Sequence, residues 1–92
     1  MPPTQTYTVV VKAPFLPLAI ARSGRWIAIE RTHDMSAAGR SFERLRQIFG
    51  SRPDACIAVI EQDVLKPGRQ RCIGQHNVDD APMLSSTRKL DA

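Results

Sequence analysis

The chain has 92 residues, of which 42% are hydrophobic and 24% charged, and five side chains are aromatic. This length fits one domain with a single modest core, and the composition argues against wholesale disorder. The sequence contains no apolar run near the ~18 residues of a membrane span, and its first residues lack the basic and apolar parts of a signal peptide. We therefore expect a cytoplasmic protein.

The chain is basic, with a net charge of +4 and a pI of about 9.7. Clustered cations bind phosphate backbones by releasing counterions. Here the basic residues are spread from Lys12 to Lys89 with acids among them, and ten of the thirteen are Arg, a bias that a GC-rich genome also produces. The charge therefore allows a nucleic-acid partner but does not indicate a site.

The first predicted strand is residues 6–13, with Tyr7, Val9 and Val11 on one face and mostly polar side chains on the other, before Pro14 ends the strand. The following segment, 18–22, has two interpretations. Pro17 can open a short helix there, or Ser23-Gly24 can form the turn of a hairpin. We favour the hairpin, which adds a strand before the next element.

The next predicted strand covers residues 25–31, with Ile27 and Ile29 as its core-facing pair. Side chains at alternate positions then share the opposite face, which a helix on the isoleucine side would leave open. A Trp on such a face is a common anchor for a protein partner. The predicted partner-binding residues are Trp26, Glu30 and Arg31.

An amphipathic helix over about residues 35–49 is the clearest predicted element. Asp34 can cap its first amides, and Gly50 is predicted to end it in a left-handed conformation. Its apolar positions lie within an arc of roughly 80°, which predicts a narrow buried stripe. The stripe consists of Met35, Ala38, Phe42, Leu45 and Phe49. The opposite side carries Arg40, Glu43, Arg44 and Gln47, with Glu43 placed to offset the charge of Arg40.

Two further strands are predicted after the helix. Residues 55–60 are apolar on both faces, which favours a central strand. Residues 66–69, Lys-Pro-Gly-Arg, match a type II turn, so residues 71–76 should return antiparallel as a polar edge strand. This hairpin places Cys72 opposite Asp63.

Four residues are candidates for metal or thiol chemistry, and they are His33, Cys56, Cys72 and His76. In the predicted register Cys72 lies about 23 Å along the sheet from Cys56, and a disulfide needs α-carbons within about 7 Å. Cys72 and His76 are separated by about 13 Å on an extended strand, too far to share one ion comfortably. We predict no disulfide, no metal site and no cofactor.

Catalytic motifs are not apparent in the sequence. His76 is predicted opposite Val59 with Glu61 as a diagonal neighbour, but no nucleophile is placed beside them. His33 precedes Asp34 at the helix entrance, where a capping role for the acid is the simpler interpretation. There is no glycine-rich phosphate loop and no serine nucleophile elbow, so we predict a protein that is not an enzyme.

These elements predict an α+β fold of order β-β-β-α-β-β, with an antiparallel sheet of four to five strands and one helix on one face. Residues 1–78 are expected to form a single domain and residues 79–92 a flexible tail. We expect a binding or regulatory protein that meets another protein, or a second copy of itself, through the open sheet face or an edge strand. Small proteins of phages, mobile elements and bacteria often have this form. The alternative is a nucleic-acid-binding protein that uses Arg22, Arg25, Arg40, Arg44 and Gln47.

Overall fold

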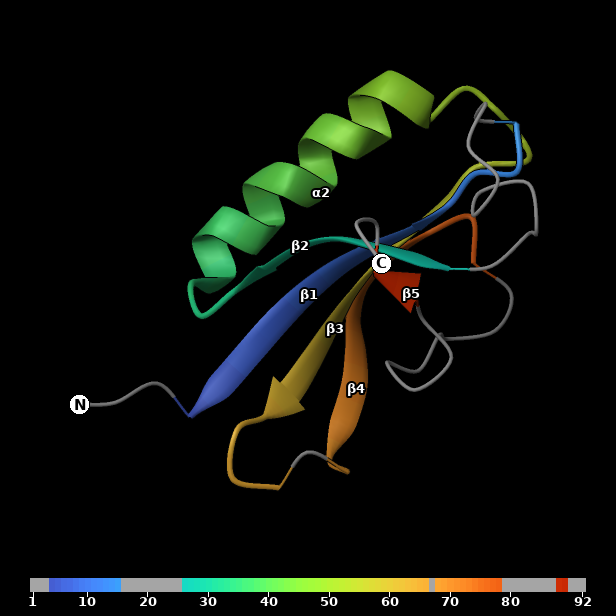
Figure 1. The fold of residues 1–92 in the computed structure, drawn as a ribbon. Helices are drawn as coiled ribbons and strands as arrows, with labels where there is room; N and C mark the ends of the chain where they lie inside the picture. The colour runs from blue at the N-terminus through green and yellow to red at the C-terminus, as the bar shows by residue number, and fades with distance from the viewer. Residues whose placement is uncertain (1–3, 16–25, 67, 79–87, 90–92) are drawn as a thin grey trace.

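The computed structural model describes residues 4–15, 26–66, 68–78 and 88–89. One helix lies along one face of a twisted sheet (Figure 1). The elements in chain order are β1 (Gln5–Lys12), β2 (Ile27–Thr32), α2 (Met35–Phe49), β3 (Cys56–Asp63), β4 (Gln70–His76) and β5 (Arg88–Lys89). Within the described residues, no helix is long and apolar enough to cross a membrane.

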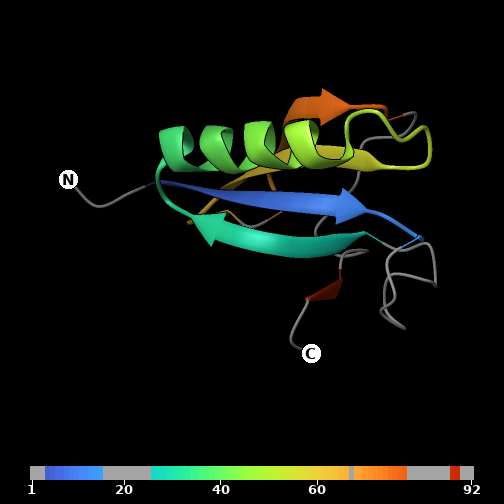
Figure 2. The same cartoon turned by 90° about the horizontal axis from the view of Figure 1, so that it is seen from above.

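The sheet has the strand order β4-β3-β1-β2-β5, with the first four strands antiparallel and β5 parallel to β2 (Figure 2). The predicted α+β class is confirmed, but the order around the helix is β-β-α-β-β. The additional strand predicted at 18–22 lies outside the described residues. Arg88–Lys89 fall in the predicted flexible tail, and the structure pairs them with Ile27 and Ala28 of β2.

The core under the helix joins α2 to the two central strands, β1 and β3. Ala38 is 1% exposed and packs on Val9 and Val59, while Phe42 and Leu45 contact the buried residues on this side of the sheet. Met35, predicted in the same stripe, is 59% exposed. It is the first helical residue, and Ala38 is the buried residue of this helix.

The two ends of α2 are stabilised differently. Asp34 Oδ1 accepts a hydrogen bond of 2.9 Å from Ser36 N, which confirms the predicted cap. Gly50 is not left-handed, because its φ is −62° and its ψ is −24°. A Cβ at this position would overlap the carbonyl oxygen of Arg46. A glycine is therefore needed at position 50 because the backbone of Arg46 lies too close to leave room for a side chain.

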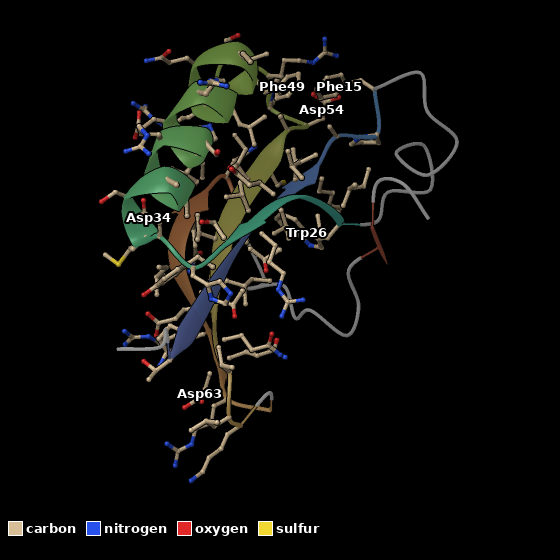
Figure 3. The ribbon with its side chains drawn as sticks, turned by 60° about the vertical axis from the view of Figure 1, so that its left-hand side comes forward. Phe15, Trp26, Asp34, Phe49, Asp54 and Asp63 are labelled. Atoms are coloured by element: carbon tan, nitrogen blue, oxygen red, sulfur yellow. The ribbon has the colours of Figure 1, made fainter. Side chains whose placement is uncertain are left out.

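A cluster of side chains connects the segment after β1 with the C-terminal end of α2. The rings of Phe15 and Phe49 meet edge to face, with centroids 5.5 Å apart (Figure 3). Arg52 places its guanidinium 3.7 Å from the Phe15 ring centroid and its Nε 3.4 Å from Asp54 Oδ1. These contacts fix the end of the helix relative to the sheet.

Two β-bulges interrupt the sheet, one in β2 and one in β4. In β2 the register shifts between Val9 and Val10 of β1, so Ile29 has no direct partner there. In β4 the register shifts beside Val59 of β3, and Ile73 is the residue without a direct partner. Ile29 is 40% exposed, so its predicted core position is wrong; the bulge turns it out of the alternating pattern.

The hairpin between β3 and β4 forms in a different register from the predicted one. Cys72 lies opposite Ile60 rather than Asp63, and His76 lies opposite Ile57. The turn itself is closed by a 2.8 Å hydrogen bond from Arg69 N to Lys66 O. Asp63 explains the shift. Its Oδ1 accepts hydrogen bonds from the amides of residues 65 and 66 at 2.8 and 3.1 Å, so the chain leaves the β3 strand at Asp63, before the predicted turn at 66–69.

Candidate functional site

The sheet face opposite α2, here called the second face, is buried at its centre. Its central residues, each at most 3% exposed, are Thr6, Thr8, Val10, Ala58 and Ile60. Trp26 packs against this group and lies across the sheet from the helix (Figure 3). The expectation of an open sheet face is therefore corrected at the centre of the sheet. β1 and β3 carry short or apolar side chains on both faces, and their central side chains are buried on both.

The three predicted partner-binding residues do not form one surface. Trp26 is half-buried on the second face, and Arg31 pairs with Thr8 of the same face and is exposed. Glu30 instead lies on the helix side, where its carboxylate accepts a hydrogen bond from the Ser41 hydroxyl. The bulge at Ile29 is the cause, since one extra residue in a strand reverses the face on which each later side chain lies.

The outer edge of β4 is the first candidate contact surface. β4 pairs with β3 on its inner side, and no other strand of the described residues pairs with it. β2, at the other side of the sheet, is partly covered by β5. Three exposed side chains alternate along β4, namely Arg71, Ile73 and Gln75. The strand therefore presents an edge of the kind that accepts another strand.

β4 is held in place at both ends. Near its start, Arg71 Nε lies 2.8 Å from Glu61 Oε1. Just after its end, Asn77 has a positive φ of 59°, and its Nδ2 donates to the carbonyl oxygens of Pro53 and Ala55 at 2.7 and 3.1 Å. The edge is therefore ordered before any partner arrives, which lowers the entropic cost of binding.

The middle of β4 lies close to a side chain of α2. A Cβ added at Gly74 would meet Val59 Cγ2 at 3.5 Å and Phe42 Cε2 at 3.9 Å, so the backbone lies beneath the Phe42 ring. The neighbouring Ile73 is 37% exposed. Packing therefore places Gly74 inward and leaves an apolar side chain at the edge.

The outer face of α2 is the second candidate surface. A shallow open hollow there is lined by Ser36, Gly39, Arg40, Glu43, Arg44 and Gln47. The structure thus brings together three predicted nucleic-acid contacts, Arg40, Arg44 and Gln47, while Arg22 and Arg25 lie outside the described residues.

The acid within this hollow has a different partner from the predicted one. Glu43 Oε2 lies 2.8 Å from Arg46 Nη2, one turn further along the helix. This hydrogen bond lowers the pKa of Glu43 and raises the pKa of Arg46. No ion pair of Arg40 or Arg44 is found in the part of the chain that the structure describes.

The candidates for metal and thiol chemistry are separated by the fold. Among the described residues there is no group of three or more His, Cys, Asp or Glu that could hold an ion. Cys56 and Cys72 form no disulfide. Cys72 lies opposite Ile60 on the second face, and His76 lies opposite Ile57 on the helix side. His33 Nδ1 is 3.2 Å from Gln5 O, an acceptor, so this ring nitrogen is the donor.

Ile73 and Asn77 are the site residues that sequence reasoning missed. A Gly within a strand pattern is a known signal of a bulge, and Gly74 directly follows Ile73. Asn tolerates positive φ, and Asn77 stands just after β4. Both signals were present, but neither specifies which neighbouring residue is turned outward.

Comparison of the chain with protein-family models, with curated proteins and with solved structures gives no match. The candidate function therefore depends on the two surfaces, the β4 edge and the outer face of α2.

Proposed function

We propose that this is a small non-enzymatic binding protein that acts through protein–protein contact, with the outer edge of β4 as its contact surface. The observation that carries the proposal is the exposed, ordered edge of β4 with Ile73 at its centre. Unpaired strand edges pair readily with another strand, because main-chain donors and acceptors gain partners.

The β4 sequence fits an antiparallel second copy of itself. Ile73 is the middle residue of Gln70–His76, so a two-fold axis there would place Ile73 against Ile73 of the second copy. The bulge at Ile73 puts Arg71 and Gln75 on opposite faces of the sheet, and the Arg71 side chains of the two copies would lie at opposite ends of the contact, so no like charges would meet. We therefore propose a second copy of this chain as the occupant of the edge.

The proposed contact is short and weak. The bulge at Ile73 increases the local twist of β4, and such bulges limit how far a neighbouring strand can pair. Arg71 at the start of the strand is exposed, and its ion pair with Glu61 would have to stay in place beside a second strand. We expect a reversible dimer that depends on protein concentration.

Light scattering across a concentration series tests the proposal. From about 10 μM to about 1 mM, a range suited to weak contacts, the average mass should rise toward that of a dimer. Ile73→Lys should keep the protein monomeric. Ile29→Lys is the matched control, because Ile29 is also a bulge isoleucine of similar exposure but lies in β2. A wild-type mass that does not change with concentration would overturn the proposal. So would an equal loss of dimer formation in Ile73→Lys and Ile29→Lys.

A further inference from the structure

We infer that the outer face of α2 binds the phosphate backbone of a nucleic acid. The surface consists of Arg40 and Arg44 with Ser36 and Gln47 at its ends. It is distinct from the β4 edge, and the inference does not depend on the dimer.

The charges of this surface are not balanced locally. Glu43 is the acid of the hollow, and its carboxylate is held by Arg46 through contacts of 2.8 to 3.3 Å. Within the described residues, that leaves Arg40 and Arg44 without a carboxylate partner, both exposed to solvent. Two guanidinium groups therefore face solvent from one side of the helix.

The spacing of the two arginines suits an extended anion. Residues four apart are separated by ~6 Å along a helix axis, and each strand of duplex DNA carries a phosphate every ~3.4 Å along the duplex axis, so the two spans are comparable over about two phosphates. Arg40 and Arg44 can therefore contact phosphates of one strand. Ser36 and Gln47 add a hydroxyl and an amide, which commonly donate to phosphate oxygens.

A bound phosphate strand would also offset a repulsion between two charges on the helix. Like charges four residues apart weakly destabilise a helix, and Arg40 and Arg44 are such a pair. An anion held between them reverses the sign of this interaction. The hollow is open rather than enclosed, which favours a long polyanion over a single small ion.

The chemistry of the whole chain agrees with this partner. The net charge of +4 attracts polyanions at long range. Only five residues of the chain are aromatic, and none lines the hollow, so stacking on bases does not contribute there. We therefore expect binding that depends on salt and shows little preference for base sequence.

Fluorescence anisotropy with a short labelled DNA duplex tests the inference. At about 50 mM salt the full chain should bind, and the affinity should fall steeply toward about 200 mM. The double variant Arg40→Gln/Arg44→Gln should weaken binding about tenfold and reduce the slope of log affinity against log salt by about two. Glu43→Gln should strengthen binding, because it removes the acid and releases Arg46.

A charge-matched control separates this surface from net charge. Arg31→Gln/Arg69→Gln removes the same charge from exposed positions away from α2, and it should change affinity far less. Circular dichroism confirms that each variant is folded. Absence of binding at low salt, or equal weakening by the control, would overturn the inference. Tighter binding to polyglutamate than to the duplex would also overturn it in favour of an acidic protein.

Discussion

Ile29 of β2 and Ile73 of β4 are the unpaired residues of two bulges that flank the same row of the sheet. Val9 and Val59 pair with each other in the centre of this row, and each bulge lies beside one of them. The two isoleucines differ in their surroundings, because β2 is next to β5 and β4 lies at the sheet edge. They have similar exposure, 40% and 37%, and therefore form a matched pair for comparing a bulge in β2 with a bulge at the β4 edge.

Thr8→Val should stabilise the fold. Thr8 is 3% exposed, and its Oγ1 is a buried side-chain oxygen that has no hydrogen-bond partner among the residues the structure describes. Replacing the hydroxyl by a methyl of similar size removes the desolvation cost of that group, which should raise the free energy of unfolding by ~1 kcal/mol. Urea denaturation measures the change. A loss of stability would mean that the hydroxyl has a partner in solution.

Asn77→Ala should destabilise the protein by about 2 kcal/mol, since it removes the hydrogen bonds to the carbonyl oxygens of Pro53 and Ala55 and places Ala at positive φ. Asn77→Gly is the control, because Gly tolerates the backbone conformation but lacks the amide. Both variants lack the amide, so the difference between their free energies of unfolding gives the cost of placing Ala at positive φ. Thermal unfolding of both gives the values, and an Asn77→Gly protein as stable as wild type would show that the amide contacts contribute nothing.

Much of the fold was predictable where one physical rule dominates. The apolar central strand β3 and the helix after Asp34 follow from periodicity and capping, and both are present. The bulge at Ile29 could not be read from alternation, because alternation assumes an unbroken ladder. The register of β4 depends on Asp63, whose carboxylate accepts hydrogen bonds from two amides that follow β3. The predicted grouping of Trp26 with Glu30 failed because of the bulge between them.

Cys72 should react slowly with alkylating reagents at neutral pH. Burial raises the pKa of the Cys72 thiol, so the reactive thiolate is scarcer than for an ordinary thiol with a pKa of about 8.5. The reaction rate should keep rising as the pH increases above that value. Mass spectrometry of peptides after timed iodoacetamide labelling measures the rate at Cys72 separately from Cys56. The same labelling in denaturant is the control, and a native rate that levels off below pH 8.5 would contradict the expectation.

The central claim is that β4 contacts another strand through its outer edge. Backbone amide shifts recorded by NMR from about 10 μM to about 1 mM test this most directly, because weak contacts change populations over such a range. The account predicts concentration-dependent shifts centred on Ile73 and extending to Arg71 and Gln75, absent in Ile73→Lys and retained in Ile29→Lys. Spectra of β4 that stay constant over the range, or changes centred on β2 instead, would contradict it.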